Sequence, residues 1–198
     1  MQRLQQALGY AFRDPSHLRL ALTHPSTKLP DNQRREFLGD AVLEFCGSDM
    51  LYQKYPDLHE GELTARRAAL VCERTLSVIA RSLDLGRYLL MGHGEEQTGG
   101  REKPSILADA MEAVLAAVYV DGGYEAARGV IRVLFQEEER RTAWRGQDDK
   151  SALQEYTQAN GLDLPAYEIV AQSGPDHDRR FTARVSVQGR PVATGEGN

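Results

Sequence analysis

Four carboxylates, arranged as two pairs, are the residues of this chain whose types and spacing could do chemistry. The first pair is Glu36 and Asp40, four residues apart in the segment RREFLGDAVLEF (residues 34–45). If this segment is helical, both carboxylates lie on one face, where like charges repel each other. No Lys or Arg follows at the next position of that face. A hard divalent cation would neutralise the pair, whereas the simpler interpretation is a solvated face of an amphipathic helix.

The second pair, Asp109 and Glu112, lies in residues 105–119, a segment that is otherwise apolar. A helix that is apolar on every side must be largely buried. Buried carboxylates are rarely tolerated unless they are paired or bind a metal. No basic residue within this segment can pair with them. We therefore expect the partner of Asp109 and Glu112 to come from outside their own helix.

Four motifs follow one another along the chain and carry a family resemblance. They are REFLGDAVL at residues 35–43, EGEL at 60–63, SILADAMEA at 105–113 and KSALQEY at 150–156. In this order and at these spacings they resemble bacterial ribonuclease III, and the resemblance covers essentially the whole chain. It implies a helical endonuclease domain over residues 1–145, a linker over 146–149 and a partial double-stranded-RNA-binding domain over 150–198.

The hydrophobic patterns predict a mainly α fold followed by a small α+β unit. Helices are expected at residues 4–12, 16–23, from 34 to before Tyr55, 60–85 with Gly86 as C-cap, 105–119 and 124–142, with a loop over 92–104 and a turn at 121–123. Beyond the linker, a helix over 151–160 and strands at 167–171, 181–187 and 192–194 are expected. This α-β-β-β order looks like a double-stranded-RNA-binding domain whose final helix is missing, so we expect a truncated or incomplete tail domain.

The resemblance also implies a set of site residues. Metal ligands are expected at Glu36, Asp40, Asp109 and Glu112, with Asp40 and Glu112 also catalytic. Two Mg²⁺ ions per site would offset the four negative charges, with Mn²⁺ as an alternative ion. Glu60 matches an acidic position near the site. Gln33 stands where bacterial members commonly carry Glu, and its amide can form hydrogen bonds but cannot neutralise a cation. Family relatives with Gln at this position still resemble active nucleases, so the resemblance implies that only an outer role is affected.

The activity implied is hydrolysis of both strands of double-stranded RNA in ribosomal and messenger RNA processing. The products would carry 5′ phosphates, 3′ hydroxyls and two-nucleotide 3′ overhangs. A homodimer is expected, with Phe37 as a knob in the interface. Positions expected to contact RNA are Arg66, Arg67, Gln154, Glu155 and His177. No nucleotide cofactor is expected, because the phosphate-binding patterns GxGxxG and GxxxxGK are both absent.

Composition sets wider bounds on the function. The net charge of −5 argues against a protein that holds nucleic acid by bulk positive charge, but it allows local basic patches. From residue 148 onward, eight Asp or Glu residues stand against five Lys or Arg. The chain has no apolar run of 18 residues and no secretory leader, so we expect a cytoplasmic protein without a membrane span. Cys46 and Cys72 are expected to be reduced core residues, and His24 is expected to have a structural role.

Two other functions remain open from the residues alone. A double-stranded-RNA-binding protein without catalysis is favoured by Gln33 and opposed by the four intact carboxylates. A di-iron carboxylate bundle also uses acidic pairs on crossing helices, but it requires Glu-x-x-His, and neither acidic pair has a His three residues on.

Overall fold

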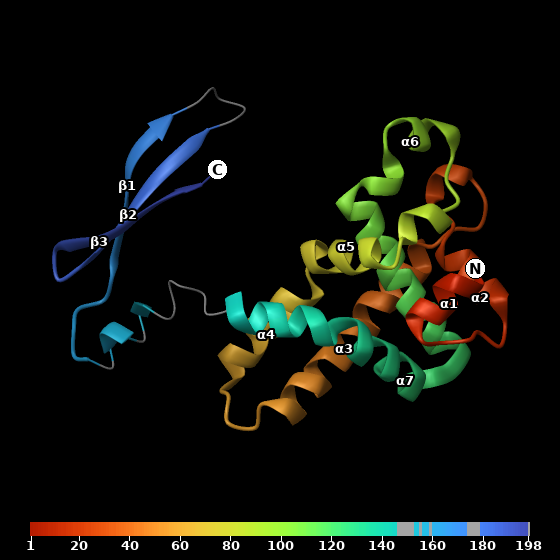
Figure 1. The fold of residues 1–198 in the computed structure, drawn as a ribbon, viewed down its shortest axis with the longest axis horizontal. Coiled ribbons are helices and arrows are strands. Elements are labelled where there is room, and N and C mark those ends of the chain that lie inside the picture. The colour runs from red at the N-terminus through yellow and green to blue at the C-terminus, as the bar shows by residue number, and fades with distance from the viewer. Residues whose placement is uncertain (146–152, 155, 159, 174–178, 198) are drawn as a thin grey trace. The chain divides into compact units, whose positions relative to one another are not determined.

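The first part of the chain is built from helices, shown with the rest of the computed structural model in Figure 1. The structure describes residues 1–145, 153–154, 156–158, 160–173 and 179–197, with the side chains of 137–145 excepted. The chain divides into two compact units, Met1–Ala143 and Trp144–Asn198, and each is described by itself. The predicted linker at 146–149 lies outside the described residues.

The helical unit contains α1 (Gln2–Leu8), α2 (Pro15–Ala21), α3 (Gln33–Lys54), α4 (Glu60–Val71), α5 (Glu73–Ser82), α6 (His93–Gln97) and α7 (Pro104–Arg145), with 3₁₀ turns η1 (Pro25–Thr27), η2 (Leu85–Tyr88) and η3 (Gly100–Glu102). Some of these helices begin where a side chain caps the helix or suits its first turn. At α2, for example, the Asp14 carboxylate accepts a 2.8 Å hydrogen bond from the Ser16 backbone nitrogen, and Pro15 occupies the first helical position.

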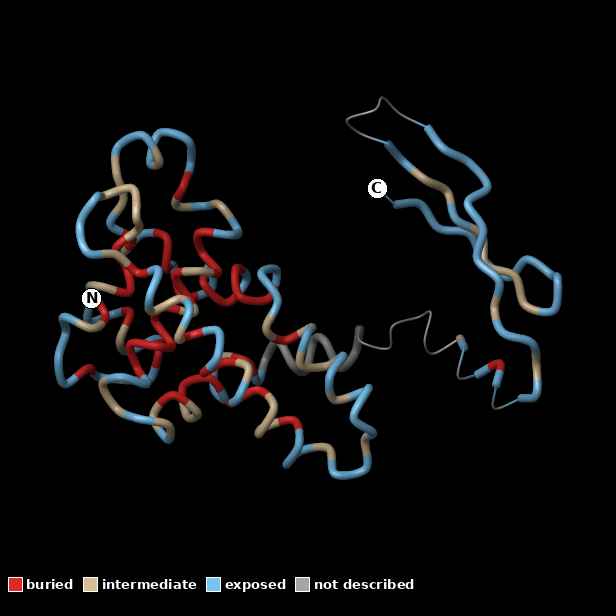
Figure 2. The backbone as a smooth tube through the Cα atoms, turned by 180° about the vertical axis from the view of Figure 1, so that it is seen from behind, coloured by how far each residue is buried: buried red, intermediate tan, exposed pale blue. Residues whose placement is uncertain are grey.

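Helix α7 lies in the centre of the core. Residues 106–118 are all buried except Asp109 and Glu112, which are half-buried, as the apolar pattern predicted. Helices α1 to α5 all contribute to this core, including Leu4 from α1, Leu43 from α3 and Leu76 from α5. Figure 2 shows the buried residues concentrated in the helical unit.

Helices α3 and α7 cross with their backbones in contact. A Cβ atom at Gly39 of α3 would overlap the backbone carbonyl of Glu112 on α7, so only glycine fits this position. Close approach of this kind is a use of glycine that requires no unusual backbone angle. The crossing therefore fixes where the acidic segment of α3 meets the acidic segment of α7.

The prediction of one helix over residues 60–85 is wrong. Cys72 has an extended backbone (φ −71°, ψ 155°), which ends α4 and begins α5. The apolar pattern continues through this break because Leu70 and Leu76 are both buried in the same core. Cys72 is exposed, not a core residue as predicted, whereas Cys46 is buried. Gly86 is not a C-cap but a buried residue of η2, where a Cβ would overlap the carbonyl of Arg101.

The predicted turn at 121–123 and the separate helix after it are confirmed. The segment labelled α7 consists of two helices that meet at Gly123, whose backbone is not helical (φ 78°, ψ −172°). Next to it, the Asp121 carboxylate accepts hydrogen bonds from the Tyr10 hydroxyl (2.7 Å) and the Arg13 and Asp14 backbone nitrogens (both 2.9 Å). Burial and this hydrogen bond raise the pKa of Tyr10 to about 12. The interruption of α7 is therefore tied to the loop that joins α1 and α2.

Residues 92–104, predicted as a loop, contain α6 and η3 and are tied down by ion pairs. Arg101 bonds Glu96 at 2.8 Å, and Lys103 bonds Glu95 at 2.6 Å. These contacts hold the chain immediately before Pro104, where α7 begins.

The second unit contains a three-stranded antiparallel sheet in the order β1-β2-β3, with β1 at Ala166–Ser173, β2 at Arg180–Val187 and β3 at Arg190–Gly197. The predicted strands are confirmed, and β3 is longer than expected. Gln188 and Gly189 form the turn between β2 and β3 with positive φ angles of 51° and 74°, which suits a two-residue hairpin loop. Of the predicted helix at 151–160, residues 153–154 and 156–158 are helical.

Within the described residues, every helix is too short or too polar to cross a membrane.

We predict that Gly39→Ala destabilises the protein, whereas Gly47→Ala does not. The new methyl group at position 39 must push α3 away from α7, and overpacking of this kind costs about 2 kcal/mol or more. Gly47 lies on the same helix, and its nearest atom would be Val71 Cγ1 at an ordinary 3.9 Å. At that position alanine contributes up to about 1 kcal/mol through helix propensity. Denaturant unfolding of the two variants measures the difference, and equal stabilities would contradict the crossing.

Candidate metal and catalytic site

The acidic site is formed where α3 crosses α7. Helix α3 carries Glu36 and Asp40 on either side of Gly39, and the backbone that Gly39 touches belongs to Glu112. Asp109 lies one helical turn before Glu112 on α7. The crossing therefore brings together the two acidic pairs that the sequence separates by about seventy residues.

No counter-charge within the described residues neutralises these carboxylates directly. Glu36, Asp109 and Glu112 are half-buried, Asp40 is exposed, and none of the four makes a hydrogen bond or ion pair with a described residue. Arg35, the neighbour of Glu36 in sequence, lies instead against α2, with its Nη2 atom 2.9 Å from Nδ1 of His17. Like charges therefore lie near one another at the crossing, with no hydrogen-bonded counter-charge among the described residues.

The electrostatic consequence is largest at Glu112. Burial, followed by the charges of Asp40, Asp109 and Glu36, raises the pKa of Glu112 to about 8. Burial also raises the pKa of Glu36, with further contributions from Asp109 and Asp40. Each of these two carboxylates therefore interacts with members of both pairs. The four groups act as one electrostatic cluster.

Asp109 lies near Glu73, an acidic residue that was not predicted to belong to the site. Burial raises the pKa of Asp109, the charge of Glu73 raises it further, and His24 opposes the shift. Glu73 is the first residue of α5, directly after the break at Cys72. Glu73 lies near Asp109 because of the break at Cys72, and no local sequence pattern predicted that break.

His24 has the structural role that was predicted. Its Nδ1 atom lies 2.8 Å from the Ser26 hydroxyl and accepts a 3.2 Å hydrogen bond from the Ser26 backbone nitrogen. Ser26 in turn accepts a hydrogen bond from the Gly92 backbone nitrogen at 2.8 Å. His24 therefore fixes η1 against the segment that leads into α6.

The chemistry of the four donors fits a divalent cation. Carboxylate oxygens are the preferred ligands of Mg²⁺, and a cation would offset the burial and the neighbouring negative charges that together raise the pKa of Glu112. In the part of the chain that the structure describes, no three Asp, Glu, His or Cys side chains already stand close enough to enclose an ion. An ion held by three or more of these carboxylates would therefore need their side chains to move closer together.

Glu60 and Gln33 lie outside this cluster. Glu60 is exposed at the first position of α4, and its carboxylate accepts a 2.9 Å hydrogen bond from the Thr64 hydroxyl. No hydrogen bond among the described residues joins Glu60 to the α3–α7 crossing. Gln33 is exposed at the first position of α3, one turn before Glu36. Their roles near the site stay predictions.

The residues predicted to contact RNA are divided between α4 and the second unit. The Arg66 guanidinium lies 4.7 Å over the Tyr55 ring. Arg67 pairs with Glu44 at 3.3 Å and donates to the Ser48 hydroxyl at 3.0 Å, so α4 is held to the second half of α3. In the second unit Gln154 is exposed. Glu155 and His177 lie outside the described residues.

Helix α3 also has an outward apolar face that is not part of the core. Phe37 is 82% exposed and Phe45 is 62% exposed, whereas Val42 on the inward face is buried. The Phe45 ring contacts Tyr124 of α7 at a centroid distance of 5.4 Å. Large exposed aromatic side chains at helical spacing are typical of a surface that binds another protein.

Comparison with known proteins matches both parts of the chain. The Ribonuclease-III-like family model matches residues 14–138, and the double-stranded RNA binding motif matches residues 150–198. Ribonuclease 3 of Desulforamulus reducens is 48% identical over 205 residues, which cover 99% of this chain and 83% of that protein. Ribonuclease 3 of Heliobacterium modesticaldum is 48% identical over 203 residues, which cover 98% and 86%.

Solved structures agree for the helical unit. The nuclease domain of ribonuclease III from Campylobacter jejuni has a TM-score of 0.67 and 44% identity, covering 70% of this chain and 95% of that one. A second structure of the same domain, also with a TM-score of 0.67 and 44% identity, covers 69% and 96% and is described as flexible in the region involved in dimer formation.

We predict that Glu112→Gln reduces the pH dependence of stability in metal-free protein. The folded state keeps the Glu112 proton up to about pH 8, whereas the unfolded chain releases it near the ordinary value of 4.5. The contribution of this carboxyl to stability is therefore fully present below pH 4.5 and is lost as the pH rises to about 8. Glutamine does not titrate, so the melting temperature of the variant in EDTA should fall less between these two pH values.

Glu125→Gln is the matched control for this experiment. Glu125 lies on the same helix, its side chain is 82% exposed, and its ion pair with Arg128 is long at 4.0 Å. The control should lose stability with rising pH as wild type does. If wild type and Glu112→Gln lose equal stability, burial and the neighbouring carboxylates do not raise the pKa of Glu112.

Proposed function

This chain belongs to the ribonuclease III family, and we propose that its acidic site at the α3–α7 crossing hydrolyses both strands of double-stranded RNA with bound Mg²⁺. The observation that carries the proposal is the electrostatic coupling of four carboxylates that have no counter-charge of their own. A purely structural helix crossing gains nothing from such a group, because crowded carboxylates repel. Mg²⁺ bound at this crossing would neutralise negative charge, so the carboxylates would attract the ion instead of only repelling one another.

The residues that would hold the cations are Glu36, Asp40, Asp109 and Glu112. Two divalent ions match their four negative charges, and Mn²⁺ is an alternative because it accepts the same oxygen ligands. When bound, the ions supply positive charge that activates water and stabilises the leaving oxygen of the phosphodiester. Glu60 and Gln33 are proposed as neighbours of this site.

Asp40 and Glu112 are proposed as the catalytic members, for different physical reasons. Glu112 is half-buried and keeps its proton in metal-free protein up to about pH 8. Its ionisation is therefore tied to the arrival of positive charge. Asp40 is exposed and faces the solvent side, from which an RNA phosphate must approach.

Recognition of duplex RNA is proposed for both units. The match of residues 150–198 to the double-stranded RNA binding motif and the three-stranded sheet found there support this role for the second unit. Arg66 and Arg67 of α4 and Gln154, Glu155 and His177 of the second unit are the proposed contacts. A binding protein without catalysis is the other candidate, favoured by Gln33 and opposed by the intact acidic cluster.

A homodimer is proposed through the outward face of α3, with Phe37 as the central knob. The exposure of Phe37 and Phe45 supports it, as does the dimer-forming region of the Campylobacter jejuni relative. A two-fold axis would give the assembly two acidic sites. Each would cut one strand, leaving 5′ phosphates, 3′ hydroxyls and two-nucleotide 3′ overhangs.

Cleavage of a long RNA duplex tests the catalytic proposal. We expect discrete shortening with Mg²⁺ and none with EDTA. Glu112→Gln should cleave at least about a hundredfold more slowly, because it removes one charge of the metal-binding cluster while duplex binding persists. The control Glu125→Gln should cleave like wild type. Cleavage in EDTA, or wild-type cleavage by Glu112→Gln, would contradict the assignment.

Sedimentation at micromolar concentration tests the dimer. Wild type should sediment as a dimer and Phe37→Asp as a monomer, because a charge cannot be buried in an apolar interface without a partner. Leu29→Asp is the control, since Leu29 is also well exposed at 60% but lies outside α3. It should remain dimeric. A wild-type monomer, or a dimeric Phe37→Asp, would show that this face is not the interface.

A further inference from the structure

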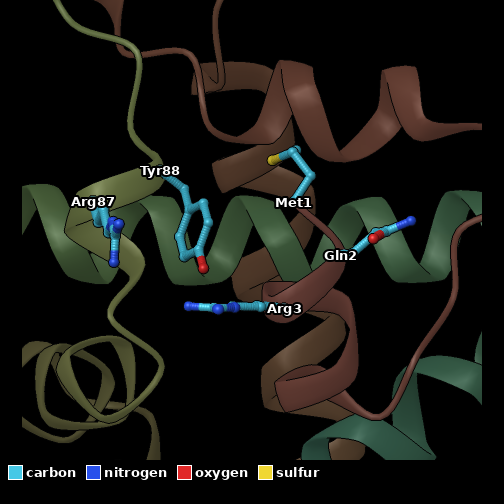
Figure 3. Close-up of a pocket in the computed structure, with 5 residues that line it drawn as sticks. All are labelled: Met1, Gln2, Arg3, Arg87 and Tyr88. Atoms are coloured by element: carbon cyan, nitrogen blue, oxygen red, sulfur yellow. The ribbon is translucent and has the colours of Figure 1, made fainter.

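A surface pocket of about 380 Å³ lies between the start of the chain and η2, and the acidic site does not use it. Figure 3 shows its lining, which comprises Met1, Gln2, Arg3, Arg87 and Tyr88. We propose that this pocket binds a phosphate group between Arg3 and Arg87. The pocket shares no residue with the carboxylate cluster, so phosphate binding there does not depend on the metal site.

Both walls of the pocket are held by contacts that need no ligand. Leu4 and Leu8 of α1 are each only 1% exposed, so the helix that carries Arg3 is anchored in the core. On the other wall, Nη1 of Arg101 donates to the carbonyl oxygens of Gly86 (2.9 Å) and Leu89 (2.7 Å). These two carbonyls flank Arg87 and Tyr88 in the chain. The pocket is therefore formed in advance of binding.

The charge of the lining is positive. Two of the five lining residues are arginines and none is acidic. Arg3 makes no hydrogen bond or ion pair with another described residue. Arg87 pairs with Asp84 at 3.7 Å, but the two side chains are 71% and 68% exposed, and exposed pairs of this kind contribute little. Both guanidinium groups are thus available in a protein whose net charge is −5.

The hydrogen-bond donors that line the pocket determine which chemical group it can bind. Guanidinium groups bind phosphate oxygens with two parallel hydrogen bonds, which a tetrahedral anion can accept from two arginines at once. The Tyr88 hydroxyl points toward the Arg3 guanidinium and adds a third donor (Figure 3). The volume lies at the lower end of the range for small-molecule sites. The phosphate can therefore come from a free phosphate compound or from the backbone of an RNA strand.

Inorganic phosphate is the first probe. It is titrated into the full chain at constant ionic strength, balanced with chloride, while the NMR signals of the arginine Nε–H groups are followed. We expect a saturable shift in wild type and its loss in the double variant Arg3→Gln/Arg87→Gln. Arg19→Gln is the matched control, because Arg19 is an exposed arginine of the same unit outside the pocket. All variants should keep the wild-type melting temperature, since the substituted side chains are exposed.

Duplex RNA binding in EDTA separates the two sources of phosphate. If an RNA phosphate occupies the pocket, the salt dependence of binding should become shallower by about one unit of log K per log salt in the double variant. An unchanged slope, with phosphate binding still lost, assigns the pocket to free phosphate compounds. If wild type shows no saturable shift, or if the double variant shows the wild-type shift, the proposal is wrong. Neither result depends on cleavage.

Discussion

The backbone contact between α3 and α7 at Gly39 is the constraint on which the rest of the structure depends. A side chain larger than hydrogen at this position would overlap the Glu112 carbonyl, and the helices would move apart. Their close approach brings two acidic pairs together and leaves α7 surrounded by the other helices. Further contacts hold α7 in place. The Asp121 carboxylate ties α7 to the loop after α1, and Arg128 ties the second part of α7 to Asp49 of α3 at 2.9 Å.

The crossing carries an electrostatic cost that folding alone does not explain. Burial and like charge raise the pKa of Glu112 to about 8 and also raise the pKa of Glu36 and Asp109. A protein selected only for stability would replace these groups with apolar residues of similar volume. Sites that bind charged ligands often keep such unfavourable interactions, because the ligand relieves them. Metal bound there as proposed would therefore be coupled to stability through the same carboxylates.

Much of the fold and of the candidate site could be predicted from the sequence, because the residue patterns that indicate them are local. The spacing of Glu36 and Asp40 and the apolar surroundings of Asp109 and Glu112 indicated the site, and alternation indicated the strands. The break at Cys72 could not be predicted, because the apolar pattern on both sides of it faces one core. Glu73 was missed for the same reason. The pocket joins Arg3 to Arg87, residues that are distant in sequence and come together only through packing.

We propose that the four carboxylates at the crossing hold divalent metal. Anomalous scattering from a crystal of the protein soaked in Mn²⁺ tests this claim most directly, because Mn²⁺ accepts the same oxygen ligands as Mg²⁺ and can be located independently of any activity. We expect anomalous density at the crossing, with carboxylate oxygens of Glu36, Asp40, Asp109 and Glu112 as the nearest protein atoms. Mn²⁺ bound only elsewhere on the protein, with these four carboxylates in contact with no ion, would contradict the account.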